Sequence, residues 1–100
     1  MIRHIVMFKL KRTGNEESLE ETKMEVKNRL EALPSLISVI RSMEVGINVV
    51  KSERAFDVAL VSTFDSLEDL ETYRVHPDHQ KVVSYIATVK DQSAAVDFEF

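Results

Sequence analysis

Cysteine and tryptophan are absent from this chain of 100 residues, and glycine and proline occur only twice each. Without cysteine there is no disulfide, no thiol nucleophile and no thiolate ligand for a metal. Because glycine and proline are the main breakers of regular structure, their scarcity predicts long helices and strands joined by few loops. A glycine-rich phosphate loop, a nucleophile elbow and the flavin and nicotinamide fingerprints are missing as well. We therefore expect no cofactor.

The remaining composition is that of an ordinary globular domain. Hydrophobic residues make up 44% of the chain and charged residues 30%, which predicts a single domain over residues 1–100. The net charge is -4 and the basic residues are scattered, so we expect no nucleic-acid binding. The apolar run Ile5–Phe8 is far too short for a signal peptide or a membrane span. We expect no membrane association and a cytoplasmic location.

Hydrophobic periodicity predicts elements in the order β-α-β-β-α-α-β. The strands are expected over residues 2–10, 38–50, 55–65 and 94–100. Asn15, Ser66 and Pro77 are typical first residues or N-caps of the three helices. Pro34 ends the first helix, and the polar segment 51–54 predicts a hairpin turn. This order is the split β-α-β pattern of an α+β, ferredoxin-like fold, with helices on one face of an antiparallel sheet.

Both faces of the predicted sheet are apolar. The face that should meet the helices carries His4, Val6, Val58 and Leu60. The opposite face carries Ile5, Met7, Ala59 and Val61. Monomers rarely expose an apolar patch of that kind, and two-fold pairing is the commonest way to bury one. We therefore expect a homodimer formed through this sheet face. The alternative is that loops or a chain end half-bury these residues.

Three histidines are the candidate general bases, since histidine titrates near neutral pH. His4 lies mid-strand, where a neutral core histidine is the simple interpretation. His76 and His79 flank Pro77, and for both the alternative to a catalytic role is that they simply lie at a helix end. Their spacing is not the i, i+4 pair of a helical zinc site, so we expect no metal.

Tyr73 precedes His79 across the predicted helix break, and a kink there can bring both side chains over the sheet. Tyr73 would then donate a hydrogen bond to a carbonyl oxygen while His79 removes a proton. Mostly apolar pockets with a few polar groups are typical of small-molecule sites. The residues expected to contact such a ligand are His4, Val6, Val58, Leu60 and His76. For Tyr73, core packing remains the alternative.

Three segments of the chain are similar to one known family. They are the strand Ile2–Lys9, the passage Thr63–Ser66, and the turn Tyr73–His79 with its His-Pro-x-His sequence. Together they resemble the stress-responsive A/B barrel (Dabb) domain over nearly the whole chain. The resemblance implies that two ferredoxin-like sheets pair into a dimeric α+β barrel. Most bacterial members have no established activity.

The resemblance also implies roles for particular residues. Plant members include a polyketide cyclase in which a tyrosine and a histidine catalyse an intramolecular aldol condensation, and Tyr73 and His79 match that pair. His4 matches its strand histidine. The chain departs from the cyclase at Val58, where the cyclase has another histidine, and at Val26, where it has an aromatic residue. Some plant members hold a cation on backbone carbonyls at positions matching Leu30, Leu33 and Leu36.

Three functional hypotheses follow. The first is a dimeric barrel that binds a small apolar or aromatic molecule without strong catalysis. The second is an enzyme, either a cyclase-like lyase using Tyr73 and His79 or a cofactor-free oxygenase. The third is a stress-associated structural protein whose role is assembly. We rank the first hypothesis first, because it requires no strong catalysis by any of these residues.

Overall fold

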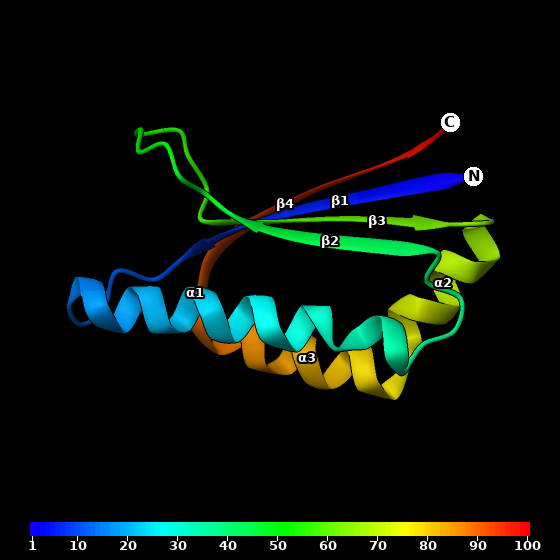
Figure 1. The fold of residues 1–100 in the computed structure, drawn as a ribbon, viewed down its shortest axis with the longest axis horizontal. Coiled ribbons are helices and arrows are strands. Elements are labelled where there is room, and N and C mark those ends of the chain that lie inside the picture. The colour runs from blue at the N-terminus through cyan, green and yellow to red at the C-terminus, as the bar shows by residue number, and fades with distance from the viewer.

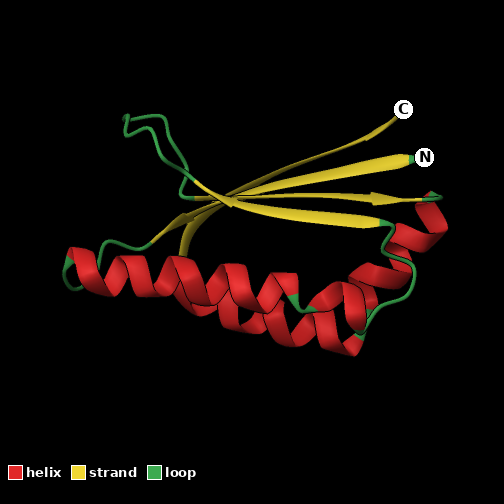
Figure 2. Cartoon of the chain, viewed as in Figure 1, coloured by secondary structure: helices red, strands yellow, loops and turns green.

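The structure, a computed structural model, describes all residues from Met1 to Phe100 and has the predicted order of elements. They are β1 (Ile2–Leu10), α1 (Glu16–Glu31), a 3-10 helix (Leu33–Ser35), β2 (Ser42–Ile47), β3 (Val58–Phe64), α2 (Leu67–Val75), α3 (Pro77–Val89) and β4 (Lys90–Glu99). The strands form one antiparallel sheet in the order β2-β3-β1-β4. The helices form a second layer below it (Figures 1 and 2). This is the ferredoxin-like α+β fold that the sequence predicts. None of its helices is long and apolar enough to cross a membrane.

The predicted helix starts are confirmed. The Asn15 side chain accepts a hydrogen bond from the Ser18 N–H (2.8 Å), and the Ser66 hydroxyl accepts one from the Asp69 N–H (3.1 Å). Between α2 and α3, His76 is extended, with φ -62° and ψ 135°. Pro77 requires this, because a residue before proline is driven out of the helical region. The proline therefore separates α2 from α3.

Three of the four strands have bounds that differ from the prediction. β2 is shorter than residues 38–50 and β3 begins later than residue 55, so residues 48–57 join the two strands. The predicted hairpin turn lies within this segment, where the Ala55 N–H donates to the Ser52 carbonyl (3.2 Å). Val49 suits a strand by composition, but its side chain is 91% exposed, because the pairing of β2 with β3 ends at Ile47 and Val58. The segment 48–57, which we call the arm, rises on the side away from the helices (Figure 1). Conversely, β4 begins at Lys90, earlier than residue 94, because backbone pairing with β1 continues through its polar start.

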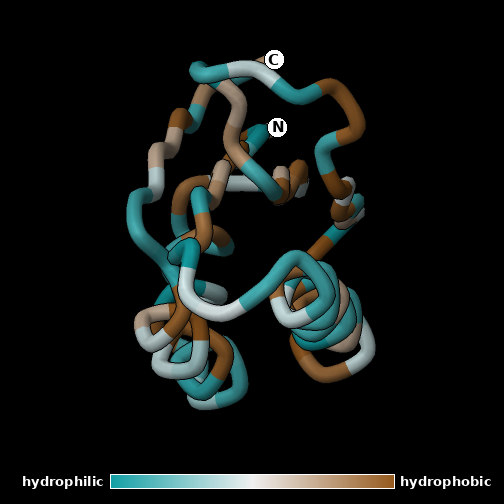
Figure 3. The backbone as a smooth tube through the Cα atoms, turned by 90° about the vertical axis from the view of Figure 1, so that its left-hand side faces the viewer, coloured by the Kyte–Doolittle hydropathy of each residue, from teal (hydrophilic) through white to brown (hydrophobic).

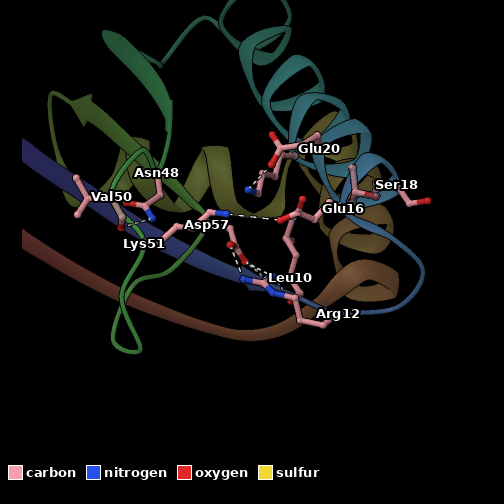
Figure 4. A network of polar contacts seen from close by, with 11 residues as sticks. Leu10, Arg12, Glu16, Ser18, Glu20, Asn48, Val50, Lys51 and Asp57 are labelled. Atoms are coloured by element: carbon pink, nitrogen blue, oxygen red, sulfur yellow. Dashed lines mark hydrogen bonds and ion pairs between the residues drawn. The ribbon is translucent and has the colours of Figure 1, made fainter.

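The base of the arm is fixed by Asp57, which is only 5% exposed. Its carboxylate accepts hydrogen bonds from the Leu10 N–H (2.7 Å) and from two nitrogens of Arg12 (2.9 and 2.8 Å). Lys51 adds an ion pair to Glu16 (3.5 Å; Figure 4). Burial acts to raise the pKa of Asp57, but the hydrogen bonds from Arg12 and Leu10 outweigh it and lower that pKa.

The two faces of the sheet are divided as predicted. The helix-facing side holds the core, and Figure 3 shows the helices end-on, on one side of the strands only. Its largest fully buried side chains are Tyr73, Phe64, Leu10, Leu33, Ile37 and Leu60. On the opposite face the strand pairing places Ile5 beside Val61 and Val96, and Met7 beside Ala59 and Ala94. No helix covers that face.

Candidate functional site

A cavity of about 210 Å³ lies between the sheet and the helices. Eleven residues line it, and eight of them are hydrophobic. They are His4, Val6, Phe8, Leu30, Leu60, Tyr73, His79, Val82, Val83, Ile86 and Lys90. Larger hollows of about 400 Å³ lie at the arm base and on the outer sheet face. At the arm base, the cations are already paired with carboxylates, so the smaller cavity is the better candidate site.

Tyr73 comes from the last turn of α2 and is 1% exposed. Its ring lies 5.1 Å from that of Phe64 and 4.1 Å from that of His79, between centroids. The hydroxyl is fully buried and has no hydrogen-bond partner in the protein. Burial raises the pKa of Tyr73, so the phenol stays protonated near neutral pH. Tyr73 therefore lines the cavity and carries a hydrogen-bond donor that no group of the protein uses.

His79 comes from the first turn of α3 and is half-buried. Its Nδ1 lies 2.9 Å from the Arg74 carbonyl oxygen, to which an Nδ1–H donates. In the neutral ring this tautomer leaves Nε2 as a free acceptor. Burial lowers the pKa of His79; the hydrogen bond to the Arg74 carbonyl acts to raise it, but burial and the nearby charges of His4, Arg74 and His76 outweigh that bond. His79 is therefore a neutral base at neutral pH.

His4 comes from β1, and its ring centroid lies 6.1 Å from that of Tyr73. Its Nδ1 is hydrogen bonded to the carboxylate of Asp97 on β4, the residue directly opposite it in the sheet. This bond orients the imidazole and turns Nε2 away from Asp97. The sequence gives no sign of the pair, because the register between the first and last strands cannot be determined from periodicity.

Five of the predicted site residues line the same cavity: His4, Val6, Leu60, Tyr73 and His79. The other two, Val58 and His76, do not line it. Val58 is buried in the core. His76 caps α3, because its Nδ1 accepts the Asp78 N–H (3.1 Å).

Sequence reasoning missed Lys90 and the apolar walls from α1 and α3. Val82 and Ile86 lie four residues apart and therefore on one face of α3, but their role in lining a cavity depends on how α3 lies over the sheet. Among the carbonyls matched to a cation site in plant relatives, that of Leu33 accepts hydrogen bonds from the Leu36 and Ile37 N–H groups (both 2.9 Å).

The three polar side chains at one end of the cavity have complementary chemistry. Tyr73 is a donor without a partner, His79 is a neutral acceptor beside it, and His4 is held by a carboxylate. Apolar walls lower the local dielectric and strengthen any hydrogen bond made there. The arrangement suits a ligand that carries a carbonyl or hydroxyl oxygen on an apolar body.

Known proteins similar to this chain include plant and bacterial ones. It is 36% identical to a stress-response A/B barrel domain-containing protein of Arabidopsis thaliana, over 98% of this chain and 36% of that protein. It is 30% identical to a second stress-response A/B barrel domain-containing protein of the same plant, over 98% of this chain and 46% of the relative. The chain thus spans less than half the length of these curated relatives.

A solved structure from Bacteroides fragilis, described as a dimeric protein of unknown function with a ferredoxin-like fold, is also similar. It is 39% identical, with a TM-score of 0.88, and the match covers 99% of this chain and 95% of that one. The family model described as Stress responsive A/B Barrel Domain matches residues 2–100. The chain therefore belongs to the stress-responsive A/B barrel domain family.

Proposed function

We propose that the cavity binds a small, mostly apolar or aromatic molecule that carries a hydrogen-bond acceptor. The observation that carries this proposal is the buried Tyr73 hydroxyl, which has no partner in the protein. Burying an unpaired hydroxyl costs about 1–3 kcal/mol. A ligand oxygen at this position recovers that cost, while the apolar walls hold the rest of the molecule.

Acetophenone and ethylbenzene test this proposal as a matched pair, since they differ mainly in the carbonyl oxygen. We expect acetophenone to bind more tightly, with amide shift changes in ¹H–¹⁵N spectra centred on Tyr73, His79 and Val82. In Tyr73→Phe the two probes should bind alike. Equal binding of both probes by the unmodified protein, or an unchanged preference in Tyr73→Phe, would contradict the role of the hydroxyl. If neither acetophenone nor ethylbenzene binds, the proposed pocket itself is contradicted.

A second candidate function, proton transfer in the manner of a cyclase-like lyase, is favoured by the contact between Tyr73 and His79. With the Tyr73 hydroxyl on the carbonyl oxygen, His79 Nε2 is the base available for a proton on the adjacent carbon. The C–H electron pair would then form an enolate whose oxygen keeps the Tyr73 hydrogen bond. General base catalysis of this kind requires a neutral imidazole, which burial of His79 favours.

Deuterium exchange into the methyl group of acetophenone in D₂O measures this step directly. Exchange should be faster with the protein than without it, and His79→Gln should remove the acceleration while leaving acetophenone binding nearly intact. His76→Gln is the matched control, because His76 lies in the same turn but outside the cavity. If His79→Gln exchanges as fast as the unmodified protein, His79 is not the base, and binding alone remains.

We also propose that the outer face of the sheet pairs with a second copy of the chain. This face carries Ile5, Met7, Ala59 and Val61, and β4 extends it with Ala94, Val96 and Phe98. Met7 and Phe98 are 40% and 41% exposed in the single chain. A relative that is 39% identical is described as dimeric. Face-to-face packing about a two-fold axis buries both patches at once.

The pairing is tested by Val96→Asp against Val75→Asp. Both valines are 53% exposed, but Val75 lies on α2, away from the sheet face. We expect sedimentation equilibrium to report a dimer for the unmodified chain and for Val75→Asp, and a monomer for Val96→Asp. A dimer that survives Val96→Asp would place the contact elsewhere. Oligomers larger than a dimer would favour the assembly hypothesis instead.

A further inference from the structure

Lys90 gives the cavity an end of a different chemical character. It is the one lysine, arginine, aspartate or glutamate that lines the cavity. It is half-buried and forms no ion pair in the structure. Its one side-chain hydrogen bond is a long one, 3.4 Å from Nζ to the Ser93 hydroxyl. A lysine that lines a mostly apolar cavity and has only a neutral partner is available to bind an anion.

The strand register places this ammonium far from Tyr73 and His79. Ser93, beside the Lys90 Nζ, pairs with Phe8, whereas Asp97 pairs with His4. Four residues of a strand separate these two levels, which is roughly 13 Å at the usual rise per residue. The cavity is therefore elongated along β1, with Lys90 at one end and His4 at the other.

A purely structural role for Lys90 is the obvious alternative, because it follows the last residue of α3, where a cation is favourable against the helix dipole. Lys11, however, already donates to the Thr88 carbonyl at that helix end (3.3 Å). The Lys90 Nζ instead reaches along β4 to Ser93. Ser93 pairs with the cavity residue Phe8, so this contact lies on the sheet face that holds the cavity rather than at the carbonyls of α3.

We propose that the ligand is a carboxylic acid, bound with its carboxylate at Lys90 and its second polar group at Tyr73 and His79. This inference rests on the proposed binding function and narrows it to one class of ligand. The charges also set the direction of binding. Asp97 lies behind His4 and repels a carboxylate from that end, whereas Lys90 attracts it. An apolar or aromatic chain of matching length spans the cavity between the two ends.

Decanoate and its uncharged counterpart decanol are suitable probes, with affinities measured by isothermal titration calorimetry below their aggregation limits. We expect the unmodified protein to bind decanoate roughly three- to tenfold more tightly than decanol, the range for one partly exposed charged contact. In Lys90→Gln the two should bind alike, with decanol affinity unchanged. Lys11→Gln is the matched control: it removes the same charge beside the same helix end but outside the cavity, and should keep the preference for decanoate.

The outcomes separate this inference from the proposed function. Equal affinities for decanoate and decanol in the unmodified protein would overturn the carboxylate assignment and leave the apolar pocket standing. A preference for decanoate that persists in Lys90→Gln would also overturn it. So would a preference that Lys11→Gln abolishes as completely as Lys90→Gln does, because the attraction would then come from the summed charges of the protein and not from contact with Lys90. Failure of both probes to bind would overturn the pocket and this inference together.

Discussion

Replacing Tyr73 by phenylalanine should make the free protein more stable and its binding site less effective. The substitution keeps the ring against Phe64 and His79 and removes only the hydroxyl, which has no partner in the protein. The desolvation cost of such a group is about 1–3 kcal/mol in protein mutational data. We therefore expect the free energy of unfolding to rise by about 1–2 kcal/mol. For a domain of this size each kcal/mol raises Tm by about 4–8 °C.

Urea unfolding followed by circular dichroism measures the change, with Tyr85→Phe as the control. Tyr85 is the other tyrosine of the chain and is only partly buried under Arg29, so its substitution should stay within about 0.5 kcal/mol. A loss of 1 kcal/mol or more in Tyr73→Phe would refute the reasoning, since it would mean that the hydroxyl is satisfied in the free protein. A gain in stability together with a lost preference for acetophenone over ethylbenzene would support it.

Two further predictions concern ionisable groups. Asp57→Ala should lower the free energy of unfolding by about 2–4 kcal/mol, because it leaves the buried Leu10 N–H unpaired and removes both bonds to Arg12, which is itself half-exposed. Since the folded pKa of Asp57 is lowered, this stabilisation is complete above the ordinary carboxyl pKa of 3.8 and is lost as the pH falls below it. The difference between the urea midpoints of the two proteins should therefore shrink in strong acid; a difference that does not change with pH would contradict this. For His79, burial lowers the pKa from 6.5, so its ring-proton NMR titration should have a midpoint below 6.5. A midpoint above 6.5 would remove the argument for a neutral base.

The fold could be predicted from the sequence because each element carries a local signal. Asn15 and Ser66 cap helices, Pro77 opens one, and alternation assigns β1 and β3 to two faces. The arm could not be predicted in this way. Val49 has strand composition, but whether a valine joins a sheet depends on a partner strand, and pairing ends at Ile47 and Val58. Local propensity carries no information about that limit.

The candidate site was only partly predictable, for a related reason. Tyr73 and His79 are close in sequence, so their meeting depends on one local break. The pairing of His4 with Asp97, and the approach of Lys90 to the cavity, depend instead on the register of β1 against β4. That register is set by long-range backbone pairing between the two ends of the chain. Sequence periodicity gives the face of a strand but not its neighbour's position.

The break at Pro77 connects the fold to the chemistry. In a continuous α-helix, Tyr73 and His79 would lie roughly 120° apart around the axis and 9 Å apart along it, too far for their rings to meet. The extended backbone of His76 ends α2 and lets α3 start in a new direction, and the two ring centroids come within 4.1 Å. The same break frees the Arg74 carbonyl, near the end of α2, to accept from His79 Nδ1. One proline thus both brings the donor to the acceptor and selects the tautomer that leaves Nε2 free for a ligand.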